Sequence, residues 1–302
     1  MRNSDGSVAV QTSTPVEAFV AYARWLETQP LAANTRRTYR VQVAQFCTYL
    51  ATSPHDADPL RERHAASYAV RDYRTWLKTV RKAKPSSVNL TLAALDHFYR
   101  FLGLDRPDVA REDLPQAAPR ALERDEQVAF LRAVERCPSA RDRALAHLLF
   151  YTGLRIGECA ALNGGDALVS SRKGVVIVRS GKGDAYREVP LNAEARRSLD
   201  AYIKDRRARG GDEPALFVNL HGRRLSTRAI DLIIRGLGHA AGIALSAHTL
   251  RHTCLTALVR NGNDLVLVAE IAGHRRLETT RRYSLPSARD RERAMEGVRV
   301  DY

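Results

Sequence analysis

The stretch YTGLRIGECAAL, residues 151–162, places an arginine directly behind a strongly apolar segment. The preceding residues predict a buried helix that ends at a Gly-Leu pair, so Arg155 would be presented from a rigid scaffold. The planar, permanently charged guanidinium suits the geometry of a phosphate. Glu158 follows three residues later and would share a helical face with Arg155 and orient it. An ordinary ion pair at the start of a helix fits the same spacing.

The string SGKGDAYREVP, residues 180–190, places Lys182 at the tip of a predicted hairpin between the β-like runs GVVIVRS and AYREVPL. Lysine is scarce here, since arginine accounts for most of the 48 cationic residues. Arginine does not release a proton in proteins, whereas lysine does when its surroundings lower its pKa. A lysine kept in this turn therefore indicates a transferable proton, although a solvated turn lysine fits it as well.

Two further strings combine histidines, arginines and one tyrosine. In SAHTLRHTCLTAL, residues 246–258, His248 and Arg251 lie three apart and would share one helical face near a phosphate, while His252 should point elsewhere. In AGHRRLETTRRYSLP, residues 272–286, His274 precedes Tyr283 in an arginine-rich segment. We expect the arginines to favour the phenolate, whose ordinary pKa is about 10, and to neutralise an approaching phosphodiester. Simple packing of the tyrosine on a helix end is the alternative.

Helical periodicity predicts four helices over residues 14–102, with Thr14 and Pro15 starting the first of them. Residues 103–121 contain three prolines and are predicted to be an extended linker. Residues 122–302 predict a second domain of helices with a small antiparallel sheet, including a short strand LFVNL and a helix at about 192–209. The apolar stripes of the first domain should form its core through Tyr39, Val43, Phe46, Leu50, Tyr73, Trp76, Leu77, Val88, Leu92, Leu95 and Phe98.

The composition limits the partners. The 302 residues have a formal net charge of +14, which favours nucleic acid as the partner. No apolar run reaches the roughly 18 residues that a membrane-spanning helix needs, and the N-terminus lacks the apolar core of a secretory signal. The four cysteines show no metal-binding spacing, which is typical of a reduced, cytoplasmic protein.

Taken together and in order, these residues resemble the tyrosine recombinase (phage integrase) family, whose signature boxes match TGLRIGE, HTLRHT and AGH…TTRRY. The resemblance covers most of the chain. It implies a mainly α fold, with a helical core-binding domain at 14–102 like that of Xer-type enzymes and a catalytic domain at 122–302 that ends in a C-terminal helix. Two departures are Ala272, at a position that is usually leucine, and the segment LNGGDALVS, which lacks a common tryptophan and acidic pair.

The resemblance also implies roles. Tyr283 would attack the scissile phosphate and form a 3′-phosphotyrosyl bond, Arg155 and Arg251 would clamp the phosphate, and Lys182 would protonate the departing 5′-oxygen. His248 would assist proton transfer at the tyrosine, His274 would hydrogen-bond the phosphate, and Glu158 would support the site. No metal or other cofactor is expected.

The expected partner is double-stranded DNA with paired recombinase sites, bound by a nucleoid-associated homotetramer that exchanges C-terminal helices. Whether a second recombinase or an accessory protein takes part stays open. The candidate DNA contacts in the first domain are Arg36, Arg37, Arg40, Arg81, Lys82 and Lys84. Two alternatives remain: a nicking-closing enzyme similar to type IB topoisomerases, and a noncatalytic DNA-binding protein on the same scaffold.

Overall fold

The computed structural model describes residues 14–54, 56–114, 120–179, 186–210, 213–274 and 276–286, together with 290, 292 and 295. Lys182, the predicted general acid, lies outside the described residues, as does most of the segment expected to form an exchanged C-terminal helix. The chain divides into two compact units, Met1–Pro115 and Gln116–Tyr302, and each is described by itself.

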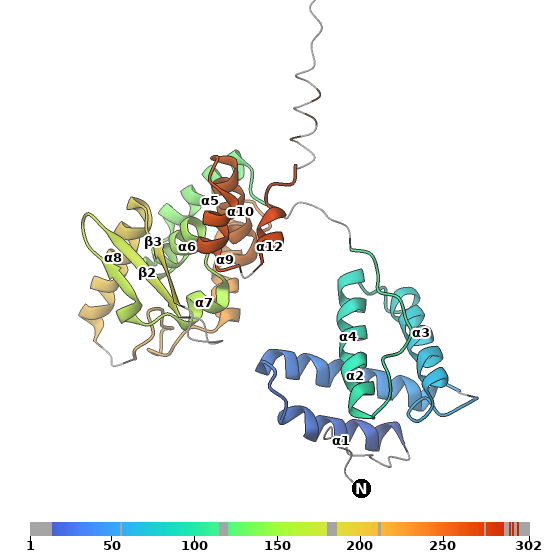
Figure 1. The fold of residues 1–302 in the computed structure, drawn as a ribbon. Coiled ribbons are helices and arrows are strands. Elements are labelled where there is room, and N and C mark those ends of the chain that lie inside the picture. The colour runs from blue at the N-terminus through green and yellow to red at the C-terminus, as the bar shows by residue number, and fades with distance from the viewer. Residues whose placement is uncertain are drawn as a thin grey trace, which may run out of the picture. The chain divides into compact units, whose positions relative to one another are not determined.

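The first unit contains the four predicted helices: α1 (Pro15–Glu27), α2 (Ala33–Thr52), α3 (Arg63–Thr79) and α4 (Pro85–Phe101) (Figure 1). The start of α1 is fixed as the sequence predicts. The Thr14 hydroxyl accepts from the backbone N–H of Glu17, and Pro15 takes the first helical position, where its missing N–H costs nothing.

The predicted apolar stripes meet in one core in the first unit. Two of the predicted residues, Tyr39 and Trp76, are only partly buried at its edge. The buried ones are Val43, Phe46, Leu50, Tyr73, Leu77, Val88, Leu92, Leu95 and Phe98. The interpretation of these aromatic residues as core residues is therefore confirmed.

The segment after α4 runs without helix or strand through residues 103–114 and is bound to the first unit. Arg111 donates to Asp96 at 2.6 Å, and Glu112 pairs with Arg74 at 2.6 Å and Lys78 at 3.0 Å. Asn89 exchanges two hydrogen bonds with the backbone of Glu112. These contacts hold the first twelve residues of the predicted linker against α3 and α4.

The second unit is mainly helical. Its helices are α5 (Arg124–Arg136), α6 (Ala140–Thr152), α7 (Ile156–Ala161), η1 (Gly164–Asp166), α8 (Ala193–Arg209), α9 (Thr227–Ala240), α10 (Ala247–Arg260), α11 (Leu265–Ala272) and α12 (Leu277–Arg281). Helix α6 is buried on all sides from Ala144 to Phe150, as expected of a helix at the centre of a core. It ends at Gly153, which adopts a left-handed conformation with φ of 61°.

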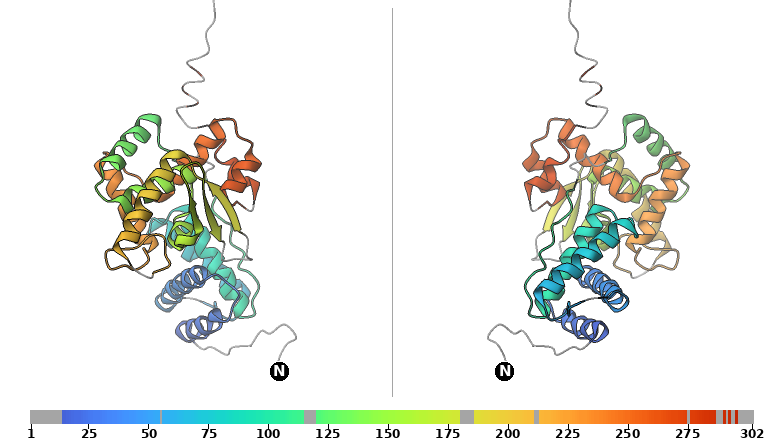
Figure 2. Two further views of the ribbon diagram at one scale, coloured as in Figure 1. Left: turned by 90° about the vertical axis from the view of Figure 1, so that its left-hand side faces the viewer. Right: turned by 90° about the vertical axis from the view of Figure 1, so that its right-hand side faces the viewer.

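A three-stranded antiparallel sheet completes the second unit, in the order β1 (Ala167–Val169), β2 (Gly174–Arg179) and β3 (Tyr186–Pro190). The predicted hairpin is confirmed by the pairing of β2 with β3, in which Val176 faces Val189. The sheet contacts the helices that follow, since α11 packs against β3 (Figure 2). The sequence did not predict β1, which is only three residues long.

The predicted strand LFVNL, residues 216–220, is wrong. The one β-bridge of this segment is the isolated pairing of Val218 with Arg224. The Asn219 side chain accepts from the backbone N–H groups of His221 and Arg223. These hydrogen bonds form a local turn in place of the backbone hydrogen bonds that a neighbouring strand would make.

Candidate active site

Arg155 lies at the junction between α6 and α7, where it is the N-cap of α7. Its guanidinium donates to Glu158 at 2.8 Å and to the backbone carbonyl of Gly273 at 3.0 Å. Its backbone N–H donates to the other oxygen of Glu158 at 2.8 Å. The predicted pairing of Arg155 with Glu158 is therefore present, and it leaves the arginine side chain 44% exposed and accessible to a ligand.

Glu158 has a second cationic partner that the sequence analysis missed. Arg187 on β3 donates to both carboxylate oxygens, at 3.1 and 2.8 Å, and its Nε donates to the backbone carbonyl of Ile271 at 2.9 Å. Burial alone raises the pKa of Glu158, but hydrogen bonds from Arg187 and Arg155 hold it below its usual value. The available signal was strand alternation, because Arg187 is two residues from buried Val189 and so faces the same side.

Gly273 joins these contacts to the end of α11. It has a φ of 63°, and a Cβ built on it would lie 2.6 Å from Arg187 Nη1. Only glycine therefore satisfies both the left-handed turn and the close approach of Arg187. The turn places His274 next to the two guanidinium groups of Arg155 and Arg251, as their effects on its pKa indicate.

Arg251 on α10 is 3% exposed and bridges two helix ends. It donates to the carbonyl of Gly153 after α6 at 2.5 Å and to the carbonyl of Ala272 at 2.9 Å. Burial, reinforced by the charge of Arg155, lowers the pKa of Arg251 to about 10. The side chain therefore stays protonated at neutral pH, held mainly by uncharged acceptors.

His274 lies between Arg251 and Thr280. Its Nε2 is 2.9 Å from Arg251 Nη2 and its Nδ1 is 2.8 Å from Thr280 Oγ1. Burial and then the charge of Arg251 lower the pKa of His274 to about 4, so the ring is neutral at pH 7. Since arginine only donates, Nε2 accepts, and Nδ1 carries the hydrogen given to Thr280. The predicted phosphate contact of His274 would require the ring hydrogen to move to Nε2, because a phosphate oxygen accepts and does not donate.

Tyr283 follows α12 and is 5% exposed. Its ring lies parallel to that of His274, with centroids 6.0 Å apart, and packs with Leu255, Val268 and Ala272. Burial raises the pKa of Tyr283, although Arg251 and other nearby arginines act in the opposite direction. The arginines therefore act in favour of the phenolate as expected, but burial outweighs their charge and the pKa of Tyr283 stays above its ordinary value.

The two histidines of α10 differ from their predicted placement. His252, which was expected to point away, is 6% exposed and its Nδ1 lies 3.1 Å from Tyr283 Oη. His248 is exposed, and its ring meets that of His252 edge-on at a centroid distance of 4.0 Å. Residues four apart lie above one another on a helix, so both histidines share a face and Tyr283 meets the second one.

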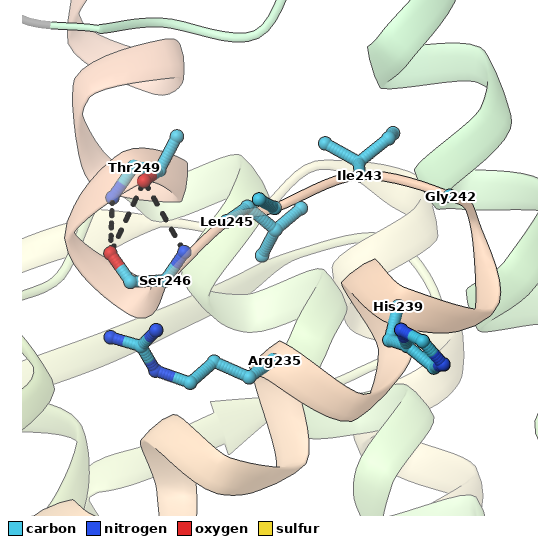
Figure 3. A pocket seen from close by; sticks show the side chains of 8 residues that line it. Arg235, His239, Gly242, Ile243, Leu245, Ser246 and Thr249 are labelled. Carbon is cyan, nitrogen blue, oxygen red and sulfur yellow. Dashed lines mark hydrogen bonds between the residues drawn. The ribbon is translucent and has the colours of Figure 1, made fainter.

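A hollow of about 600 Å³ lies at the start of α10. Ser246 and Thr249 border it and cap the helix through reciprocal hydrogen bonds of 3.2 to 3.3 Å (Figure 3). Arg235 and His239 of α9 also line it, whereas the residues that surround Tyr283 do not. The hollow is therefore separate from the arginine and histidine cluster.

The candidate DNA contacts in the first unit form two groups. Arg36 and Arg40 lie within ion-pair distance of Glu27, at 3.7 and 3.1 Å. The other four are exposed, and Arg81 lies over the ring of Trp76 at 5.7 Å. Those four are Arg37, Arg81, Lys82 and Lys84.

Three other structural observations concern metals, thiols and membranes. Within the described ranges, no three His, Cys, Asp or Glu residues are grouped so that they could hold a metal ion. All four cysteines are free thiols. A search of the described helices for one long and apolar enough to cross a membrane finds none.

Comparisons with known proteins agree with this geometry. The model of the phage integrase family matches residues 120–289, and that of the phage integrase N-terminal SAM-like domain matches residues 17–104. Tyrosine recombinase XerC of Roseiflexus sp. is 32% identical over 287 residues, which cover 89% of this chain and 88% of the relative. Tyrosine recombinase XerA of Pyrococcus furiosus is 28% identical over 288 residues, 93% of each chain.

Solved structures show the same fold. A pre-cleavage complex of XerH site-specific recombinase with its difH substrate superposes with a TM-score of 0.74 at 19% identity, covering 96% of this chain and 98% of the other. The crystal structure of XerA recombinase gives a TM-score of 0.55 at 28% identity, covering 95% and 100%. With an N-terminal helical domain, a helical catalytic domain and its small antiparallel sheet, the chain belongs to the phage integrase family and is a tyrosine-type, Xer-like site-specific recombinase that cuts and rejoins DNA.

Proposed function

We propose that Tyr283 is the nucleophile of this recombinase. The phenol gives up its hydrogen with the assistance of His248 as its oxygen attacks the scissile phosphorus, the bond from phosphorus to the 5′-oxygen breaks, and a 3′-phosphotyrosyl ester forms. Lys182 gives a proton to the departing 5′-oxygen. The reverse attack by a 5′-hydroxyl rejoins a strand and releases the tyrosine, so that the phosphodiester energy is conserved without an energy source.

The single observation that carries this proposal is the convergence of Tyr283 with Arg251 in one chain. Burial raises the pKa of Tyr283, and Arg251, Arg282 and Arg155 are the charges that oppose this shift. A dianionic transition state placed among fixed guanidinium groups gains more stabilisation than it would in water, because the groups need not reorganise. Arg155 and Arg251 are therefore assigned to the nonbridging oxygens of the phosphate.

The remaining assignments follow from exposure and hydrogen bonding. Glu158 holds Arg155 in place through two hydrogen bonds of 2.8 Å. His248 is the exposed histidine of α10 and is assigned to assist proton transfer at the tyrosine. His274 is assigned to the phosphate. To donate to a phosphate oxygen, its Nε2 would give up the hydrogen bond from Arg251 and carry the ring hydrogen, and Thr280 would then donate to Nδ1.

The DNA partner is proposed to carry two recombinase sites and to be bound by a homotetramer. A lambda integrase tetramer has been solved on a Holliday junction, and XerH has been solved on difH DNA, which supports this assembly as the model for this chain. The net charge of +14 and the exposed cations Arg37, Arg81, Lys82 and Lys84 favour contacts to the DNA backbone. The protein would act in the compartment that holds the chromosome.

The proposal is tested with a nicked suicide substrate that contains the target site, identified by footprinting on the DNA that flanks the gene. The wild-type chain should form a covalent protein–DNA adduct that resists denaturant. Tyr283→Phe should bind the DNA with unchanged affinity and form no adduct. Tyr186→Phe removes the hydroxyl of a tyrosine that is 65% exposed on β3, and this matched control should form the adduct normally.

Adduct formation by Tyr283→Phe would refute the assignment of the nucleophile. Relaxation of any supercoiled plasmid, without dependence on paired sites, would indicate a nicking-closing enzyme of the topoisomerase type. DNA binding by the wild-type chain with no adduct on any substrate would favour the noncatalytic alternative.

A further inference from the structure

We propose that His252 is a positioning residue for strand cleavage, which accepts the hydroxyl hydrogen of Tyr283 on Nδ1 and thereby turns the phenolic lone pairs toward Arg251. The inference rests on the proposed role of Tyr283 as the nucleophile. It assigns a function to the histidine that directly follows the clamping arginine in the sequence.

The contact joins two separate parts of the second unit. His252 lies in the second turn of α10, and Tyr283 follows α12, 31 residues later. Nδ1 and Oη are 3.1 Å apart, and the ring centroids are 5.5 Å apart at an interplanar angle of 46°. With side chains only 6% and 5% exposed, neither group exchanges this partner freely for water.

The direction of this hydrogen bond follows from the charges around it. His248 and Arg251 on α10, Arg282 after α12 and His274 after α11 all act on His252. Burial, followed by these groups, lowers the pKa of His252 to about 3, so its ring is neutral under physiological conditions. A neutral imidazole has one acceptor nitrogen, and a protonated phenol has one hydrogen to give. Among the described residues, the hydroxyl of Tyr283 has Nδ1 as its one hydrogen-bond acceptor, so a ring hydrogen on Nδ1 would leave the buried phenolic hydrogen without a partner. Tyr283 therefore donates to Nδ1, and Nε2 carries the ring hydrogen.

Fixing the phenolic hydrogen also fixes the orientation of the lone pairs. Once the hydrogen points to His252, the lone pairs face other directions, and Arg251 is the nearby cation that acts most strongly to lower the pKa of Tyr283. Arg251 is also the group assigned to the phosphate. The nucleophilic oxygen thus directs its electrons to the place where the phosphorus would be held, and this alignment lowers the entropic part of the barrier.

His248 does not duplicate this role. It is exposed and touches the His252 ring by its edge, so one histidine faces the solvent and the other holds the tyrosine. Replacement of His252 should consequently affect the chemical step, without a change in DNA binding.

The test compares three substitutions in the full-length chain: His252→Asn, His252→Gln and His252→Leu. The asparagine amide reaches the position of Nδ1, the glutamine amide reaches the position of Nε2, and leucine offers no acceptor. We expect His252→Asn to retain single-turnover cleavage of the suicide substrate within about 3-fold of wild type. His252→Gln and His252→Leu should cleave about 10- to 100-fold more slowly, with DNA affinity unchanged.

Thermal unfolding of each variant separates positioning from folding. If His252→Leu does not fold, the comparison of His252→Asn with His252→Gln still tests the inference. Both variants carry the same amide group and differ in whether it reaches the position of Nδ1 or of Nε2. Equal cleavage rates for the asparagine and glutamine variants, or wild-type cleavage by the leucine variant, would overturn the inference. The role of Tyr283 would then stand if Tyr283→Phe forms no adduct, and it would fall separately if that variant forms one.

Discussion

Arg187 connects β3 to Glu158 and to the end of α11, and we expect it to stabilise the candidate active site without contacting the DNA phosphate itself. Its side chain is 15% exposed, and it makes two charge-assisted hydrogen bonds to Glu158 and one hydrogen bond to the Ile271 carbonyl. Arg187→Ala removes all three and leaves Glu158, itself 16% exposed, with Arg155 as its cationic partner. Removing one member of such a pair costs about 3–5 kcal/mol when burial is complete. Because both groups keep some contact with water, we expect about 3 kcal/mol.

That loss should lower the thermal midpoint of the second unit by roughly 6–12 °C, at about 2–4 °C per kcal/mol for a unit of this size. Cleavage should also slow by about 10- to 100-fold at temperatures where the variant is folded, because Arg155 and the Gly273 turn lose their shared support. The assays are thermal unfolding by circular dichroism and single-turnover cleavage of the suicide substrate.

A matched control comes from the same hairpin. Arg179 pairs with Asp166 at 2.9 Å, but its side chain is 69% exposed, so Arg179→Ala should cost less than about 1 kcal/mol. Arg187→Lys keeps the positive charge but lacks the planar guanidinium that donates to both oxygens of Glu158. It should therefore recover only part of the stability that Arg187→Ala loses. Wild-type stability and cleavage in Arg187→Ala would refute the reasoning that this residue braces the site.

Three other predictions concern the turn at Gly273, the buried His252 and the proposed general acid Lys182. Gly273→Ala should destabilise the second unit by about 1–3 kcal/mol and slow cleavage. The backbone φ of 63° at this position is strained for alanine, and the added Cβ would meet Arg187. An unfolding curve identical to that of the wild type would contradict this prediction. The free energy of unfolding should fall as the pH drops below about 6.5. With a pKa of about 3 for His252 in the folded chain, only the unfolded chain binds a proton at this histidine between pH 3 and about 6.5. His252 alone should therefore contribute up to about 1.4 kcal/mol per pH unit. His252→Asn should reduce that slope in urea titrations at pH 4 to 6.5. Lys182→Ala should slow cleavage, and a substrate with a 5′-bridging sulfur, whose leaving group needs no proton, should restore it; no rescue would reassign the general acid.

The helices and the hairpin were predictable because their signals are local. Thr14 and Pro15 mark a helix start through their own backbone chemistry, and the stripe through Val88 and Leu95 depends only on the 3.6-residue period. The segment LFVNL misled the prediction because Leu216 and Phe217 are buried without a paired strand, and Asn219 turns the chain through its side chain. An apolar sequence alone did not distinguish a paired strand from a buried turn.

The composition of the site was predictable from residue order, but its hydrogen bonds were not. Which of His248 and His252 meets Tyr283 depends on where the turn after α12 packs, and the periodicity of α10 contains no information about that. Arg187 was missed for the same reason. Its partners Glu158 and Ile271 lie 29 and 84 residues away along the chain, and a single strand of alternating residues does not specify them.

The contacts of Arg251 are compatible with its proposed role, in which a buried cation has to bind a phosphate. A buried charge is normally tolerated because an opposite charge accompanies it, and a carboxylate at this position would cancel the attraction for DNA. Arg251 instead donates to the carbonyls of Gly153 and Ala272 and to neutral His274. These acceptors satisfy its hydrogen bonds without removing its charge, and the one carboxylate that acts on it, Glu158, is held by Arg155 and Arg187. The helix ends marked by Gly153 and Gly273 therefore serve the chemistry directly, since they supply carbonyl groups where an acidic side chain would have neutralised the site.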